Sequence, residues 1–127
     1  MKYMLLIHQA DAPRPRREGE GNDRAVAAFE SLSDDEKQAI FRDYQAVNQT
    51  PGVTPGLQLA DPDNATTVRV QDGKTLTTDG PFVEMKEAVG GWLVFEADDL
   101  DAAIELAARI PAARLGGAIE VRPVVEW

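Results

Sequence analysis

The amino-acid sequence predicts an α+β fold in which two amphipathic helices accompany a mainly antiparallel β-sheet. Residues 2–8 and 91–96 are apolar on both faces, a pattern typical of strands that are covered on both sides. Residues 33–47 and 98–109 combine helix start signals with apolar side chains at helical spacing. An Asp-Gly pair between two β-branched runs predicts a hairpin, because its two-residue turn requires positive φ.

Length and composition favour one compact domain spanning residues 1–127. A chain of 127 residues normally builds one hydrophobic core, and 43% of its residues are apolar. Its 13 basic and 22 acidic residues give a net charge of −9, which disfavours binding to nucleic acid or to an anionic membrane surface. Cysteine is absent, and no apolar run reaches the roughly 20 residues that a membrane span needs. We therefore expect a cytoplasmic protein with no nucleic-acid or membrane partner.

The first half of the chain predicts a strand, a loop and two helices. The strand is residues 2–8, and the loop at about residues 11–24 is rich in proline, glycine and arginine, so we expect it to be mobile and solvated. Residues 23–29 predict a short helix. A longer helix starts at Ser33, whose hydroxyl can accept a hydrogen bond from the amide of Glu36 in a capping box. We expect its apolar face to pack in the core; this face consists of Ile40, Phe41, Tyr44 and Val47.

The second half adds the remaining strands and one further helix. Prolines and glycines lead into a short strand near residues 57–59, and Asp72-Gly73 then joins the two strands of the hairpin. A helix follows the strand at residues 91–96; aspartates favour its start and a proline ends it. Its expected buried stripe is Leu100, Ile104, Ala107 and Ala108. With a last strand at residues 118–125, the order of elements fits a ferredoxin-like split β-α-β sandwich with an inserted β-hairpin.

One face of the predicted sheet is apolar but is not covered by the predicted helices. In such a fold both helices pack on one face of the sheet. The central strands nevertheless direct apolar side chains toward both faces: Met4, Leu6, Trp92, Leu93, Val94 and Phe95. An exposed apolar patch of this size usually marks an interface. We therefore expect a homodimer in which two sheets pair face to face around a twofold axis.

Ordered sequence motifs extend over nearly the whole chain. They are residues 1–7, 65–69, 79–87, 90–91, 96–103, 107–112 and 121–124, with Asp79-Gly80-Pro81-Phe82 as the most distinctive. In these motifs the chain resembles the YCII-related family, specifically its branch of DGPF-domain proteins. The resemblance implies a fold of the dimeric α/β-barrel type, frequent proximity to sigma-factor genes, and an activity that is mostly unassigned. Related YCII-like proteins carry a His–Asp pair proposed to be catalytic, but its histidine lies in the first helix, where this chain has none.

One histidine carries the candidate acid–base chemistry. His8 is the only histidine in the chain, and histidine is the natural general acid or base near neutral pH. It needs a carboxylate to orient it, and Asp79 at the end of a predicted strand is the candidate. The sequence favours a structural interpretation of each residue, since a strand-end histidine can make an ordinary hydrogen bond and Asp-Gly-Pro is typical of a turn. His8 and Asp79 remain the candidate catalytic pair.

The residues that follow this turn predict a ligand site. Phe82, Glu84 and Lys86 combine aromatic, acidic and basic side chains, which suits a loop that holds a polar ligand; Glu84 and Lys86 are equally compatible with a solvent-facing ion pair. Paired histidines are absent, so we expect no metal and no cofactor. Because the catalytic His–Asp pair of the related proteins is missing, we predict a non-catalytic, dimeric module that binds a small polar ligand or has a regulatory role. The alternative is a small-molecule enzyme that uses His8 and Asp79.

Overall fold

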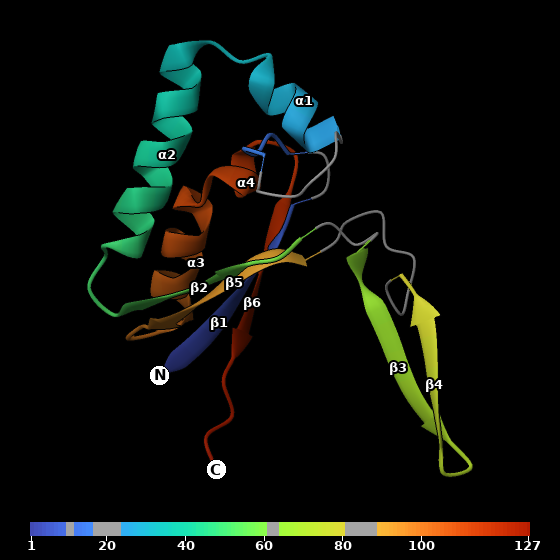
Figure 1. Ribbon diagram of the computed structural model, residues 1–127. Coiled ribbons are helices and arrows are strands. Elements are labelled where there is room, and N and C mark those ends of the chain that lie inside the picture. The colour runs from blue at the N-terminus through green and yellow to red at the C-terminus, as the bar shows by residue number, and fades with distance from the viewer. Residues whose placement is uncertain (10–11, 17–23, 61–63, 81–88) are drawn as a thin grey trace.

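An antiparallel sheet forms the centre of the computed structural model, which describes residues 1–9, 12–16, 24–60, 64–80 and 89–127 (Figure 1). Its four strands are β1 (Lys2–His8), β2 (Val53–Gln58), β5 (Val89–Glu96) and β6 (Ala118–Pro123). They lie in the order β2-β5-β1-β6, and every neighbouring pair is antiparallel. The chain passes from β1 to β2 across β5, and from β5 to β6 across β1. This order confirms the α+β class and is compatible with the predicted ferredoxin-like arrangement.

Helices cover one face of this sheet. The described residues form α1 (Arg24–Glu30), α2 (Asp34–Asn48), α3 (Leu100–Arg109) and α4 (Pro111–Arg114). Figure 1 shows α2 and α3 together on the same side of the sheet. The core between the two layers joins side chains of β1, β5, α2 and α3: Tyr3, Leu5, Ile7, Val47, Leu93, Phe95 and Leu106. None of the helices in the described ranges is long and apolar enough to cross a membrane.

Two side-chain caps start the long helices where the sequence predicts them. Oγ of Ser33 accepts a hydrogen bond from the amide of Glu36 at 3.2 Å, at the start of α2. Oδ1 of Asp99 accepts one from the amide of Ala102 at 2.8 Å, at the start of α3. Each bond satisfies an amide that has no partner within its own helix. Both helix starts are therefore confirmed.

The apolar face of α2 is divided between the core and helix α1. Ile40 and Val47 are buried as predicted, and Tyr44 is partly buried. Phe41 is 55% exposed, so its expected place in the core is wrong. Its ring meets the ring of Phe29 edge-on, with 5.8 Å between the centroids. Because α1 lies beside the start of α2, Phe41 packs against that helix instead of the sheet.

The buried side of α3 differs from the predicted stripe. Leu100 and Ile104 are 48% and 50% exposed, and Ala107 is the buried member of the predicted set. The buried residues follow another helical spacing, Ala103, Leu106, Ala107 and Ile110. Each of the two sets forms a stripe along one side of the helix, so helical spacing alone does not tell which stripe is buried. The turn after α3 indicates which one it is. Pro111 and Ala112 are buried there, on the side of the chain that continues the buried residues of α3.

The predicted hairpin forms a separate two-stranded sheet. Strands β3 (Thr66–Gln71) and β4 (Lys74–Asp79) are joined by Asp72 and Gly73, with φ of 52° and 75°. Both values are positive, as the turn requires. Figure 1 shows the hairpin standing apart from the main sheet. Three of its apolar side chains are exposed: Val68, Val70 and Leu76.

Part of the predicted mobile loop is packed against the domain. Residues 12–16 follow β1 and run beside α1, where the amide of Arg14 donates to the carbonyl of Ala25 at 3.1 Å. Ala12 is fully buried and Arg14 is 6% exposed. This segment is therefore not the solvated excursion expected from its composition. Residues 17–23, in the same predicted loop, lie outside the described part of the chain.

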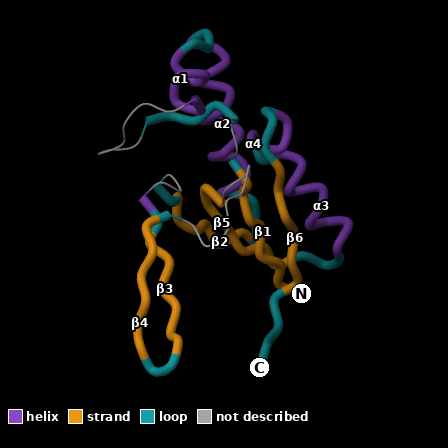
Figure 2. Tube along the Cα trace, turned by 90° about the vertical axis from the view of Figure 1, so that its right-hand side faces the viewer, coloured by secondary structure: helices purple, strands orange, loops and turns teal. Residues whose placement is uncertain are grey.

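The second face of the sheet carries no helix among the described residues (Figure 2). Met4 and Val94 are cross-strand neighbours there, as are Leu6 and Trp92, and all four are half-buried. The indole of Trp92 lies over Gly56 of β2. A Cβ atom at position 56 would lie 2.5 Å from Cε3 of Trp92, so only glycine leaves room for this ring. We call the four apolar residues the open face.

Candidate functional site

His8 ends β1, and its ring contacts a glutamate of the neighbouring strand β6. Nε2 of His8 lies 3.0 Å from Oε1 of Glu120. The register places His8 opposite Ala118 and Leu6 opposite Glu120. Residues that are directly opposite point to the same side of a sheet, so the side chains of His8 and Glu120 lie on the side of the sheet that carries the open face. The side chain of His8 is 11% exposed and that of Glu120 is 36% exposed. A carboxylate thus orients the imidazole at one end of the sheet, as general acid–base chemistry requires.

Glu120 is held by a second donor on its own strand. Nε of Arg122 hydrogen-bonds to Oε2, the carboxylate oxygen that His8 does not contact. The hydrogen bond of Arg122, followed by that of His8, lowers the pKa of Glu120 below its ordinary value. The three side chains form a polar row, which we call the His8–Glu120–Arg122 row, next to the apolar open face.

The lowered pKa of Glu120 predicts a pH-dependent contribution to stability. A carboxylate whose pKa is lower in the folded than in the unfolded state stabilises the fold fully at pH values above its unfolded pKa, here 4.5. This contribution is lost as the pH falls through the folded pKa. We expect acidification from about pH 6 to about pH 3 to destabilise Glu120→Gln less than the parent. Urea unfolding at both pH values measures the difference. Glu105→Gln, at an exposed helical position, is the control. If Glu120→Gln and the parent lose equal amounts of unfolding free energy on acidification, the prediction is wrong.

Asp79 lies on the hairpin and has the surroundings of a turn residue. It is exposed at the end of β4, and the next residue, Gly80, has a φ of +96°. The carbonyl of Gly80 accepts a hydrogen bond from Oγ1 of Thr67 at 2.8 Å. These features support the turn interpretation of the motif. In the described part of the chain the ring of His8 pairs with Glu120 and makes no hydrogen bond to Asp79, so the His8–Asp79 pair stays a prediction.

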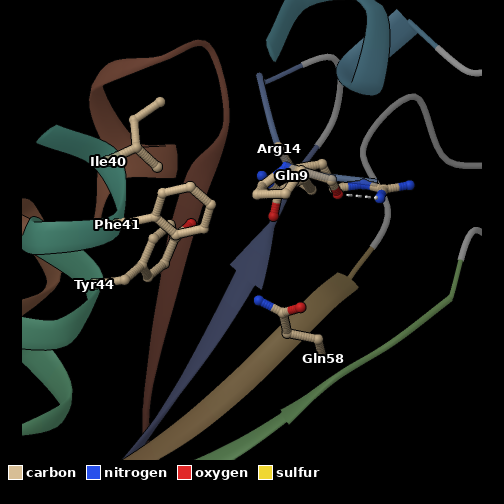
Figure 3. A pocket seen from close by; sticks show the side chains of 7 residues that line it. Gln9, Arg14, Ile40, Phe41, Tyr44 and Gln58 are labelled. Atoms are coloured by element: carbon tan, nitrogen blue, oxygen red, sulfur yellow. Dashed lines mark hydrogen bonds between the residues drawn. The ribbon is translucent and has the colours of Figure 1, made fainter. Parts of the chain in front are cut away.

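A cavity of about 90 Å³ lies between α2 and the end of the sheet (Figure 3). One of its walls is apolar and aromatic and comes from a single helix, α2, through Ile40, Phe41 and Tyr44. The facing residues come from β2 and from the segments after β1, and they are Gln9, Arg14, Pro15 and Gln58. The cavity is therefore apolar on its helix side and polar on the other.

The strand register explains how the two glutamines reach this cavity. Gln58 lies after a bulge in β2 and pairs with Gly91 of β5. Gln9 directly follows β1, and a Cβ atom at Gly90 would lie 3.0 Å from its Cβ and 3.2 Å from its Oε1. Gly90 thus leaves room beside the side chain of Gln9, and Gly91 lies 3.8 Å, measured from a Cβ built on it, from the Cα atom of Gln58. Arg14 is turned away from α2 in Figure 3, and its Nη1 donates to the carbonyl of Pro15 at 3.2 Å.

Comparison with known proteins identifies the family. The family model of the YCII-related domain matches residues 1–127. The chain belongs to the YCII-related family. An uncharacterised protein of Rhizobium meliloti (strain 1021) is similar to this YCII-related domain, with 32% identity over 108 residues, which cover 81% of the chain and 86% of that protein. The predicted family is confirmed, and the narrower DGPF branch stays a prediction.

Sequence reasoning missed most of the polar residues that this YCII-related domain brings together. Glu120 was not a candidate, because its contact with His8 depends on the register of β1 against β6. The charged residues Glu120 and Arg122, two positions apart in an otherwise apolar strand, were the available signal. Gln9 and Gln58 give no such signal, since single glutamines are common on protein surfaces.

The proposed ligand residues Phe82, Glu84 and Lys86 lie outside the described residues, so their role in the YCII-related domain stays a prediction. Within the described ranges, no three histidine, aspartate or glutamate side chains gather as metal ligands would. The described polar groups that remain as candidates are the His8–Glu120–Arg122 row and the lining of the cavity. These two sites lie on opposite faces at the same end of the sheet.

Proposed function

We propose that this YCII-related domain is a non-catalytic, homodimeric binding module whose cavity beside α2 takes a small polar molecule. The observation that carries the proposal is the composition of the cavity, in which glutamine side chains face an aromatic wall. Sites for small molecules typically combine apolar walls with a few convergent polar groups. A regulatory role, which the resemblance to proteins encoded near sigma-factor genes implies, would make this molecule a signal.

The size of the cavity limits its occupant. In another protein, a cavity of roughly 150 Å³ accommodates a benzene ring. The cavity beside α2, at about 90 Å³, is smaller. We therefore expect a compound of about five nonhydrogen atoms, or one such group of a larger molecule. Phe41 is half exposed at this wall and offers apolar surface to the part of a larger molecule that stays outside.

Nuclear magnetic resonance can test the binding site directly. We expect at least one member of a panel of small alcohols, ketones, amides, carboxylates and amines to shift the signals of Gln9, Tyr44 and Gln58 together. Gln58→Ala should weaken that binding several-fold, because it removes one of the two amides. Gln71→Ala is the matched control, since Gln71 is an exposed glutamine on the hairpin. If no compound shifts the three signals, the binding function is wrong.

The proposed second copy covers the open face. Its four apolar residues lie together on the side of the sheet that carries no helix among the described residues. In the His8–Glu120–Arg122 row beside it, the single carboxylate is paired with two partners, one of them the cation Arg122. Two copies with a charge of −9 each repel one another, so their contact costs least where apolar side chains, rather than carboxylates, meet.

A charge placed on the open face should separate the two copies. Val94→Glu puts a carboxylate beside Met4 and Trp92, and we expect sedimentation equilibrium to change from dimer to monomer because burying that charge is costly. Ile104→Glu is the matched control, because it adds the same charge at a half-exposed position of α3. A monomeric parent, or a dimer that withstands Val94→Glu, would contradict this mode of association.

The contact of His8 with Glu120 favours one other function, a small-molecule enzyme. A histidine oriented by a carboxylate is a general acid–base pair, and the predicted partner Asp79 is an alternative for the same role. The two functions differ in the fate of the bound compound. An enzyme would consume it, and His8→Asn would stop the consumption. If the protein is a binding module, the nuclear magnetic resonance signals of the ligand stay unchanged over days with the parent and with His8→Asn.

A further inference from the structure

We propose that the cavity beside α2 selects an uncharged, planar group with both a hydrogen-bond donor and an acceptor, such as a carboxamide, urea or lactam. This inference rests on the proposed binding function and names its ligand class. Three features of the cavity lead to it: the hydrogen-bonding groups of Gln9 and Gln58, a described lining with no carboxylate and with Arg14 directed away from the aromatic wall, and that wall of α2 itself.

The hydrogen-bonding groups are the first feature. A glutamine side chain offers an acceptor oxygen and two donor hydrogens. Gln58 belongs to β2 and Gln9 directly follows β1, and both lie on the side of the cavity that faces α2 (Figure 3). Together they can satisfy a ligand that needs a donor and an acceptor at once. A site built to hydrogen-bond such groups discriminates strongly against analogues that lack them.

Charge is the second feature. Among the described residues that line the cavity, Arg14 is the single ionisable group with a formal charge at neutral pH. It is 6% exposed, and Figure 3 shows its guanidinium directed away from the aromatic wall. No described carboxylate lines the space. A cation would therefore lose its water without gaining an opposite charge from a described residue of the lining, which is costly. An anion would meet only Arg14, whose Nη1 already donates to the carbonyl of Pro15. The net charge of −9 adds repulsion against anions.

Shape is the third feature. Phe41 and Tyr44 are three residues apart on α2, so their rings lie on the same side of the helix. Figure 3 shows both rings on the wall that faces Gln58. A flat group can lie against these rings while its edge reaches the glutamines. The volume of about 90 Å³ suits a carboxamide with a short alkyl chain.

A matched pair of probes separates the ligand class from the existence of the site. Propionamide and propionate have the same size and shape and differ in charge, and propylammonium supplies the opposite charge. Each is titrated to tens of millimolar, because so small a ligand binds weakly. We expect propionamide to shift the signals of Gln9, Tyr44 and Gln58 at concentrations at least tenfold lower than propionate or propylammonium.

A near-isosteric substitution tests the role of the amide. Gln58→Glu replaces donor hydrogens with a carboxylate, so propionamide should bind several-fold more weakly and propylammonium should gain affinity. Gln71→Glu adds the same charge on the hairpin and should leave both affinities unchanged. If propionate binds as well as propionamide, the ligand class is wrong although the binding site remains. If none of the three probes shifts the cavity signals while another polar compound does, the ligand class is also wrong. If nothing shifts them, the binding function fails as well.

Discussion

Leu106→Ala is expected to lower the free energy of unfolding by about 2–5 kcal/mol. Leu106 is 1% exposed in α3 and packs in the cluster that contains Leu5, Val47 and Leu93. Truncation removes buried methyl groups and leaves a cavity between the helix and the sheet, which close-packed neighbours fill only in part. Urea denaturation measures the loss as a lower midpoint with an unchanged slope.

Leu100→Ala is the matched control on the same helix. Leu100 is 48% exposed, and it belongs to the stripe that the sequence wrongly predicts as buried. A substitution on the exposed side of a helix usually changes stability by less than about 0.5 kcal/mol. The comparison therefore tests the rotation of α3. A larger loss for Leu100→Ala than for Leu106→Ala would reverse the assignment of its buried side.

Gly56→Ala is expected to destabilise the fold by roughly 1–3 kcal/mol or more, through overpacking. The new Cβ would lie 2.0 Å from the carbonyl oxygen of Trp92 and 2.5 Å from Cε3 of its ring. The ring can rotate, but the backbone of β5 is held by β1 on its other side, so the strands have to separate. We expect a lower urea midpoint and a changed near-ultraviolet circular dichroism of Trp92.

Gly116→Ala distinguishes steric overlap from backbone strain. Gly116 has a φ of +100°, and a Cβ atom there meets nothing within 4 Å. Its substitution should cost only the strain of a left-handed backbone, about 1–2 kcal/mol. The tryptophan signal should stay as in the parent. Gly56→Ala with an unchanged tryptophan signal would show that Trp92 does not lie over β2.

The features that sequence predicts well in this chain are local. The caps at Ser33 and Asp99 and the Asp72-Gly73 turn each depend on a few neighbouring residues, and all three are confirmed. The failures need tertiary information. Two overlapping stripes on α3 both have helical spacing, and only the buried turn after the helix selects one. Phe41 has the spacing of a core residue, but its packing depends on where α1 lies.

The candidate sites are predictable only in part for the same reason. His8 is found from the sequence because it is the only histidine. Its partner Glu120 lies 112 positions away, and a change of one residue in the register of β1 against β6 would move it to the other face. The cavity needs α2, β2 and the segments after β1 to converge, and no local pattern encodes that convergence.

The hairpin β3–β4 gives the molecule two levels of local stability. Among the described strands, β3 and β4 pair only with each other, and a lone two-stranded ribbon is marginally stable in water. Its backbone amides can therefore exchange with solvent through a local opening, whereas the amides of β1 and β5 exchange only when the whole domain unfolds. A partner that rests on Val68 and Val70 would slow this exchange without contacting the core. The hydrogen-exchange rate of the hairpin amides therefore reports the binding of a partner to the hairpin, independently of the stability of the main sheet.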